Sequence, residues 1–280
     1  MSHSSLEKED YDVFRKFLEE ACGIVLGDNK HYLVTSRLTR LCQDFSFSSL
    51  KDMLDSLKRG GNNALRQSII DAMTTNETSW FRDTYPFDIL SSSLFPEFVE
   101  KKKNSLRIWS SASSSGQEAY SISMTFSEFM EKNLGAFSGR LEIVGTDISP
   151  SMLKHAREAK YDELSLARGL SDARLKKYFD CNNDGGYTIK TELKNRCRFM
   201  ELNLLNNYNA VGKFDIIFCR NVLIYFSAEV KSAILNRMAT TLNPGGYIIL
   251  GGSESPTGYS DAFQMIRLPA GVIYKLKDAK

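Results

Sequence analysis

The spacing of apolar residues differs between the first 75 residues and the part of the chain beyond about residue 88. In the first part, apolar side chains recur at intervals of three or four, which is the period of an amphipathic helix. They include Phe14, Phe17, Leu18 and Cys22, then Leu50, Met53, Leu54 and Leu57. Gly and Asn at 26–29 and 59–63 interrupt the pattern, because these residues accept the left-handed backbone that ends helices. We therefore predict an all-helical N-terminal domain over residues 1–73.

Beyond residue 88 short β-rich runs alternate with helical stretches, which predicts a parallel sheet with helices on both faces. The predicted strands cover 106–109, 141–145, 198–202, 214–219 and 247–250, and a helix is expected over 118–131. Two last runs, 263–267 and 272–276, are joined by Leu268-Pro269-Ala270-Gly271 and are expected to add antiparallel edge strands.

One segment, 161–195, does not follow this alternation. Asn182-Asn183-Asp184-Gly185-Gly186 stands between the β-rich pairs Tyr178-Phe179 and Tyr187-Thr188, which is a hairpin pattern. A hairpin between two units of an α/β fold indicates an inserted antiparallel β-subdomain.

Composition narrows the class of protein. Of 280 residues, 42% are hydrophobic and 25% charged, and 36 basic residues nearly balance 34 acidic ones, so the chain is not expected to coat nucleic acid. The five cysteines show no CxxC spacing, so neither a metal site nor a disulfide framework is expected. No apolar run reaches 18 residues, and we expect a cytoplasmic protein without membrane insertion.

Polar residues follow several predicted strands, where ligands of open α/β sheets bind. The loop 110–116 has small side chains that would let a ligand approach the start of the next helix, but its only glycine is Gly116, which disfavours a dinucleotide site. Asp147 follows the second strand at the position where such folds bind a ribose diol, or it is the N-cap of the next helix.

Three further positions are candidates with open alternatives. Asn203 could lie beside a base or be a turn residue. Arg220 and Asn221 follow a buried apolar run, and a buried Arg-Asn pair needs a partner. Arg220 could instead brace a loop carboxylate, and Tyr225 could be a core residue.

Four segments together resemble the CheR family of chemotaxis receptor glutamate methyltransferases. They are Thr74-Thr75-Asn76-Glu77-Thr78-Ser79-Trp80-Phe81-Arg82, the loop ending in Gly116-Gln117-Glu118, Thr146-Asp147-Ile148, and Phe218-Cys219-Arg220-Asn221-Val222-Leu223-Ile224-Tyr225-Phe226. The last run is the most specific. Gln117 and Trp80 depart from the residues common in the family.

The resemblance implies a fold, a cofactor and a partner. The fold would be α/β: a Rossmann-like class I methyltransferase domain over 89–280 with the inserted β-subdomain, reached through a linker over 74–88. S-adenosylmethionine would be bound by Asn76, Thr78, Arg82, Glu118, Asp147, Asn203, Leu204, Arg220 and Asn221, with Arg82 and Tyr225 as catalytic residues. The partners would be chemotaxis receptors, through their methylation helices and in some members a C-terminal tail peptide. We expect a monomer, recruited to membrane receptor arrays, that binds no nucleic acid.

The implied reaction is attack of a glutamate carboxylate on the sulfonium methyl, giving a γ-methyl ester and S-adenosylhomocysteine. A glutamate with a pKa near 4.3 is already ionised at neutral pH, so no general base is required. The alternatives are a methyltransferase of this fold with another substrate, and an inactive receptor-binding adaptor.

Two surface elements are expected to serve the receptor. Lys30, Arg37 and Arg40 would share one helix face and attract an acidic receptor helix, unless they only form a solvated face. The insert, with a strand starting at Lys176-Lys177, would bind a receptor tail, and its deletion would leave S-adenosylhomocysteine binding nearly intact. It could also be purely structural.

Overall fold

The chain forms two compact units in the computed structural model, which describes residues 6–60, 62–183 and 185–278. One unit reaches to Thr75 and includes Tyr225–Val230, and the other comprises Asn76–Ile224 and Lys231–Lys280. Residues 1–5, 61, 184 and 279–280, which the expected domains include, lie outside the described residues.

The first unit is a helical domain, as its apolar period predicts. Its helices are α1 (Lys8–Cys22), α2 (His31–Asp44), α3 (Leu50–Lys58) and α4 (Asn63–Met73). Two of them begin at side chains that accept a backbone N–H, Ser49 from Asp52 at 3.1 Å and Asn62 from Leu65 at 3.0 Å. Their apolar faces meet in a core that includes Phe14, Leu18, Val34, Leu38, Met53 and Ile69.

The second unit is built on a seven-stranded sheet of order β6-β2-β1-β7-β8-β10-β9. Its strands are β1 (Ser105–Ser110), β2 (Arg140–Asp147), β6 (Cys197–Glu201), β7 (Phe214–Cys219), β8 (Leu242–Leu250), β9 (Phe263–Leu268) and β10 (Gly271–Leu276). β6, β2, β1, β7 and β8 pair in parallel, whereas β10 pairs antiparallel with both β8 and β9. The predicted strands are confirmed, except that only β9 of the closing pair forms an edge.

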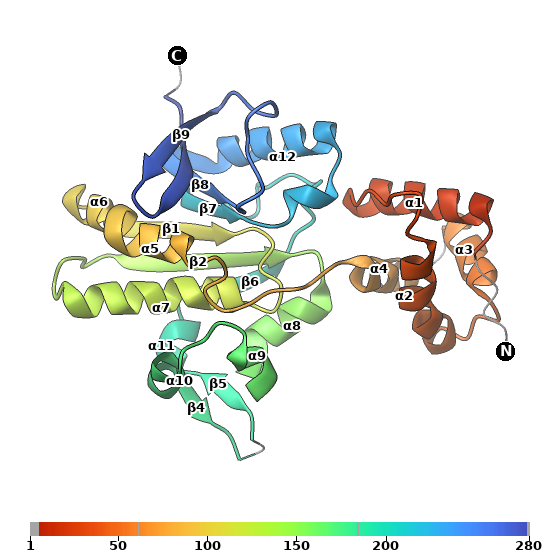
Figure 1. Ribbon diagram of the computed structural model, residues 1–280, viewed down its shortest axis with the longest axis horizontal. Coiled ribbons are helices and arrows are strands. Elements are labelled where there is room, and N and C mark those ends of the chain that lie inside the picture. The colour runs from red at the N-terminus through yellow and green to blue at the C-terminus, as the bar shows by residue number, and fades with distance from the viewer. Residues whose placement is uncertain (1–5, 61, 184, 279–280) are drawn as a thin grey trace. The chain divides into compact units, whose positions relative to one another are not determined.

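Helices cover both faces of this sheet (Figure 1). They are α7 (Gln117–Lys132), α8 (Pro150–Glu158) and α12 (Ala228–Thr241), with α5 (Tyr85–Ile89) and α6 (Phe95–Glu100) joined by a π-helical turn at Leu90–Leu94. The strand order reverses direction at β1, so right-handed crossovers place α7 and α12 on opposite faces. No helix in the described ranges combines the length and hydropathy needed to cross a bilayer.

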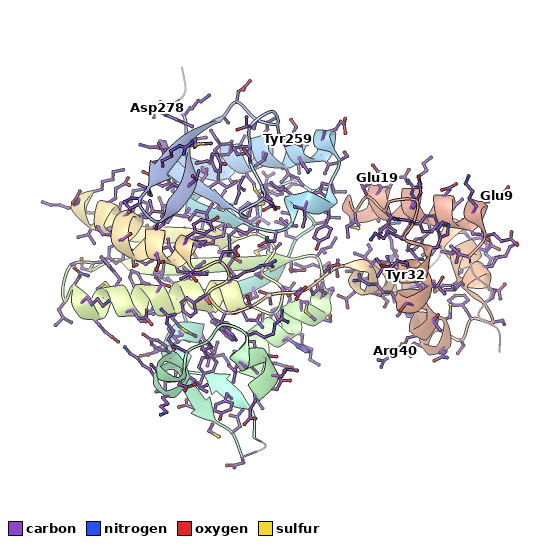
Figure 2. The ribbon with its side chains drawn as sticks, viewed as in Figure 1. Glu9, Glu19, Tyr32, Arg40, Tyr259 and Asp278 are labelled. Atoms are coloured by element: carbon purple, nitrogen blue, oxygen red, sulfur yellow. The ribbon has the colours of Figure 1, made fainter. Side chains whose placement is uncertain are left out.

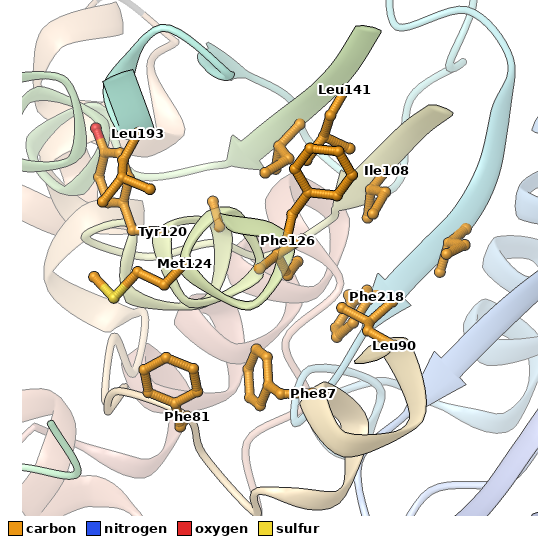
Figure 3. Packing of buried hydrophobic residues seen from close by; sticks show 14 of the residues in the cluster. Phe81, Phe87, Leu90, Ile108, Tyr120, Met124, Phe126, Leu141, Leu193 and Phe218 are labelled. Atoms are coloured by element: carbon orange, nitrogen blue, oxygen red, sulfur yellow. The ribbon is translucent and has the colours of Figure 1, made fainter. Parts of the chain in front are cut away.

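The core between α7 and the sheet is aromatic and aliphatic. Figure 3 shows Phe126 of α7 beside Ile108 of β1 and Leu141 of β2. Phe126 also meets Phe95 edge to face, with ring centroids 5.3 Å apart. Each fully buried side chain of this kind contributes about 1.5–3 kcal/mol, so this packing holds the strand ends that carry the site.

The predicted insert is a separate three-stranded antiparallel sheet of order β3-β5-β4. Its elements are β3 (Lys160–Tyr161), α9 (Glu163–Ala167), α10 (Asp172–Tyr178), β4 (Phe179–Cys181), β5 (Tyr187–Ile189) and α11 (Thr191–Lys194). The expected strand start at Lys176-Lys177-Tyr178 is wrong, because these three residues lie in the last turn of α10 and β4 begins at Phe179. Ser171 caps that helix by accepting from Arg174 N at 3.3 Å, and cations in the last turn complement the helix dipole.

Candidate functional site

Residues at or just after the ends of β1, β2, β6 and β7 are hydrogen-bonded to one another at the carboxyl edge of the sheet. Ser113 N donates to Thr146 O at 2.8 Å, and Ser111 N donates to Phe218 O at 2.9 Å. Leu202 N donates to Asp147 O at 2.9 Å. The structure therefore gathers at one edge the strand ends that the sequence singled out separately.

Asp147 ends β2 with a buried carboxylate that organises the loop after β1. Its Oδ2 accepts from Ser114 N at 2.8 Å and its Oδ1 from Ser149 N at 3.0 Å. The N-cap of α8 is Ser149, whose hydroxyl accepts from Met152 N at 3.1 Å, so the alternative of Asp147 as the cap is wrong. A carboxylate accepts about four hydrogen bonds, and ribose binding by Asp147 stays a prediction.

Arg220 is the centre of a buried charge network. Its side chain is 2% exposed, and Nη1 donates to Glu118 Oε2 at 2.9 Å. Nη2 donates to Asp83 Oδ2 at 2.8 Å and to Arg82 O at 2.7 Å. Burial by itself would lower the pKa of Arg220, but the two carboxylates raise it above its ordinary value. Arg220 thus braces the segment that carries Arg82, as one of the two sequence readings held.

Residues 76–84 run beside this network with an unusual backbone. Phe81, Asp83 and Thr84 have φ angles of 49°, 65° and 53°, a region that non-glycine residues rarely adopt. Ser114 Oγ donates to Asn76 O at 2.8 Å, and Arg82 Nη1 donates to Glu77 O at 3.2 Å. Such a conformation persists only where the surroundings hold it.

Asn203 and Leu204 lie in the loop after β6 and stabilise its turn. Asn203 Oδ1 accepts from Leu205 N at 2.9 Å, so its side chain closes a turn, as the more cautious reading of the sequence held. Leu204 is buried, and its carbonyl accepts from Tyr208 Oη and Arg237 Nη1, both at 2.8 Å. Contact of either residue with a base stays a prediction.

Tyr225 belongs to a different compact unit from the other candidates. It ends a 3₁₀ turn, Leu223–Tyr225, and groups with the helical unit, whereas Arg82, Asp147 and Arg220 belong to the second unit. Thr78, in the linker segment, is half-buried and also belongs to the second unit.

Glu254 is a residue of this edge to which the sequence assigned no role. It lies in the loop after β8, is 9% exposed, and accepts four backbone N–H groups. The donors are Asn221, Val222, Leu223 and Gly251, at 2.7–3.0 Å. The sequence did contain an indication of this role, because Glu254 is an acid soon after a buried strand. The same pattern drew attention to Asp147.

A glycine makes this carboxylate's approach possible. A Cβ at residue 251 would lie 2.6 Å from Glu254 Oε2 and 3.0 Å from Asn221 N, so a larger residue there would displace the carboxylate. Glu254 thereby ties the loop after β8 to the loop after β7, where Asn221 has a φ of 56°.

The polar groups at this edge of the sheet differ from those of a typical metal site. Among residues 6–60, 62–183 and 185–278, no group of three His, Cys, Asp or Glu side chains could hold a metal ion. The described residues at the sheet edge are instead carboxylates, hydroxyls and a guanidinium, which suit a polar organic ligand.

Comparison with known proteins accounts for both units. Residues 9–74 match the family model described as CheR methyltransferase, all-alpha domain, and residues 76–272 match the CheR methyltransferase, SAM binding domain. The chemotaxis protein methyltransferase of Vibrio parahaemolyticus is 51% identical over 99% of this chain and 100% of its own. The chemotaxis protein methyltransferase Cher2 of Pseudomonas putida is 49% identical over 96% of this chain and 98% of its own.

A more distant relative matches over a similar length. The chemotaxis protein methyltransferase of Salmonella typhimurium is 34% identical over 95% of this chain and 89% of its own. The family models and the relatives agree, and the resemblance seen in the sequence motifs is confirmed. The chain belongs to the CheR methyltransferase family, with S-adenosylmethionine as its cofactor.

Proposed function

We propose that this chain methylates the γ-carboxylates of glutamates on chemotaxis receptors, using S-adenosylmethionine. The observation that carries the proposal is the match of both family domains along nearly the whole chain. Full-length relatives named chemotaxis protein methyltransferase support it. The buried polar groups at the sheet edge supply a site of suitable chemistry.

The residues at the sheet edge fit the cofactor's polar groups. Arg220 Nε and the hydroxyl of Ser113 are buried without a hydrogen-bond partner in the protein, which is costly unless a ligand supplies one. We propose that Asp147 accepts hydrogen bonds from the ribose hydroxyls. The rest of the cofactor site would be lined by Asn76, Thr78, Arg82, Glu118, Asn203, Leu204, Arg220 and Asn221. The bound cofactor supplies an electrophilic methyl group.

The chain's own contribution is positioning. A glutamate is ionised at neutral pH, and neither described histidine serves as a base in this site. His31 stacks on Tyr11 in the helical unit at 3.7 Å, and His155 is an exposed residue of α8. Arg82 would steer the incoming carboxylate and Tyr225 would orient it. Orientation of this kind is worth roughly 7–11 kcal/mol in well-aligned cases.

The catalytic assignment has a direct test. Arg82→Ala and Tyr225→Phe should lower kcat by about ten- to a hundredfold, since each removes an orienting contact and not a core side chain. Thermal unfolding of both variants should stay close to that of the wild type. Wild-type turnover by both variants would remove these two residues from the reaction.

The proposed setting is the cytoplasm, with the protein as a monomer that is recruited to receptor arrays and binds no nucleic acid. The decisive experiment incubates the protein with labelled S-adenosylmethionine and receptor-containing membranes, then releases methanol with alkali. Base-labile label on receptor glutamates is the expected product. A base-stable methyl would assign another methyltransferase activity, and tight S-adenosylhomocysteine binding without transfer would assign an adaptor.

A further inference from the structure

The inserted β-subdomain packs against the linker segment at Trp80 and hydrogen-bonds to it. This side chain is 1% exposed and meets the rings of Tyr161 and Phe179 edge to face, at centroid distances of 4.9 Å and 5.4 Å. Its Nε1 donates to Ser165 O at 3.2 Å, and its backbone N donates to Arg168 O at 2.9 Å. Trp80 is thus anchored to the insert by both side chain and backbone.

The neighbouring Phe81 is held from the insert as well. The Arg174 guanidinium of α10 lies 3.6 Å from the centre of the Phe81 ring. Arg174 is itself fixed by two hydrogen bonds to Glu128 of α7, at 2.8 Å and 2.9 Å. The Phe81 backbone N donates to Ser121 Oγ of α7 at 3.1 Å. The insert and α7 together fix the residue just before Arg82.

The contact leaves no room at Gly169. This glycine has a φ of 99°, and a Cβ there would overlap the carbonyl oxygen of Trp80. Gly185, also in the insert, has a φ of 82° but nothing within 4 Å of where its Cβ would be. The two glycines share the left-handed backbone and differ in whether the linker lies against them.

We propose that the insert is a positioning element for the cofactor site, acting through Trp80 and Phe81 on Arg82. The left-handed residues 81, 83 and 84 need to be held. Arg220 bonds to residues 82 and 83 of this segment, and the insert contacts residues 80 and 81. The inference rests on the proposed role of Arg82 and deepens it. It reverses the expectation that deletion of residues 162–194 leaves S-adenosylhomocysteine binding nearly intact.

The same contact should act in both directions. If docking of the insert favours cofactor binding, cofactor binding favours docking of the insert by the same factor. The amide of Trp80, bonded to Arg168 O, should therefore exchange more slowly with solvent when S-adenosylhomocysteine is bound.

The test compares Gly169→Ala with Gly185→Ala, because both add a methyl group to a left-handed glycine of the insert. Gly169→Ala should weaken S-adenosylhomocysteine binding by about tenfold and lower kcat, as expected when orienting groups are displaced. Gly185→Ala should match the wild type in both. Calorimetry gives the affinities, and hydrogen exchange at Trp80 should speed up only in Gly169→Ala.

Arg174→Gln is the second test, for the case that Gly169→Ala does not fold. It removes the guanidinium contact with the Phe81 ring without adding bulk. Raised Kd and lowered kcat in Arg174→Gln, with unfolding like that of the wild type, support the proposal. Wild-type Kd and kcat in Arg174→Gln, or equal Kd values for the two glycine variants, overturn it. S-adenosylhomocysteine affinities are measured without receptor. They therefore test this proposal even if the chain is found not to methylate receptor glutamates.

Discussion

Charged residues of the same types behave differently in the two units. In the methyltransferase unit, Arg220 is 2% exposed and bonded to two carboxylates within 2.9 Å. In the helical unit, Arg40 is 87% exposed and lies 3.9 Å from Asp44 (Figure 2). Removing one partner of a buried ion pair leaves the other charge buried and unpaired, which is costly. An exposed ion pair is screened by water and contributes little to stability.

Arg37 of the helical unit is intermediate between these two arginines in its exposure and its contacts. Its guanidinium donates to the carbonyls of Met73 at 2.8 Å and Thr74 at 3.0 Å, at the end of α4. Lys30 is the N-cap of α2, and Arg40 is an exposed residue of the same helix. Arg37 therefore closes a helix end, and attraction of an acidic receptor helix by these three cations stays a prediction.

The largest expected effect is that of Arg220→Met. It leaves Glu118 and Asp83 without their cation, and breaking a buried pair costs about 3–5 kcal/mol. We expect the lower end of that range, because Asp83 is 41% exposed. Denaturant unfolding measures the loss. Arg220→Lys should recover only part of it, since an ammonium lacks the guanidinium fork. Wild-type stability of Arg220→Met would show that the buried ion pairs of Arg220 contribute no more to the free energy of unfolding than exposed pairs do.

Glu254→Ala should rank second. It removes the acceptor of four backbone N–H groups, and each buried donor left unpaired costs about 1–3 kcal/mol. Because the loop can relax and admit water, we expect a loss of about 2–4 kcal/mol in the free energy of unfolding. Asp261→Ala, at an exposed acid, is the matched control and should change little. Equal unfolding of the two variants would argue against the role of Glu254.

Asp147→Ala should act on the ligand more than on the fold. Loss of charge-assisted bonds to the ribose should weaken S-adenosylhomocysteine binding by about 1.5–3 kcal/mol. Part of that loss would come from the loop at Ser114, which Asp147 holds at 2.8 Å. Calorimetry measures the affinity. Comparison with Asp147→Asn, which keeps the shape of the side chain and removes its charge, separates the two contributions. Unchanged affinity in Asp147→Ala would remove this residue from the cofactor site.

The smallest effects belong to the helical unit. Arg37→Ala should lower stability by about 1–2 kcal/mol, because the last carbonyls of α4 lose a charged donor. Arg40→Ala should change it by no more than about 0.5 kcal/mol, as for most exposed pairs. Thermal unfolding at low and high salt compares them. A larger and more salt-sensitive loss of stability in Arg40→Ala than in Arg37→Ala would contradict this ranking of the two arginines.

Local patterns carried most of the fold. Helical period, β-rich runs and the run of Asn, Asp and Gly at 182–186 each depend on neighbours a few residues apart, and they sufficed to predict the helical unit, the strands and the insert. The same logic failed at Lys176, Lys177 and Tyr178, where a helix capped at Ser171 runs to Tyr178 and occupies the start of the predicted strand. The residues at the strand ends could be found, because parallel strands end at one edge.

The partners of these residues were decided by tertiary structure alone. Arg220 and Glu118 are 102 positions apart in the chain, and Trp80 and Ser165 are 85 apart. A buried polar group is satisfied by whichever segment the fold brings within about 3 Å, which no local period encodes. The sequence by itself therefore determined which elements form and which residues end them. Only the packing of distant segments decided that Arg220 braces the linker, that Glu254 joins two loops, and that the insert holds Trp80.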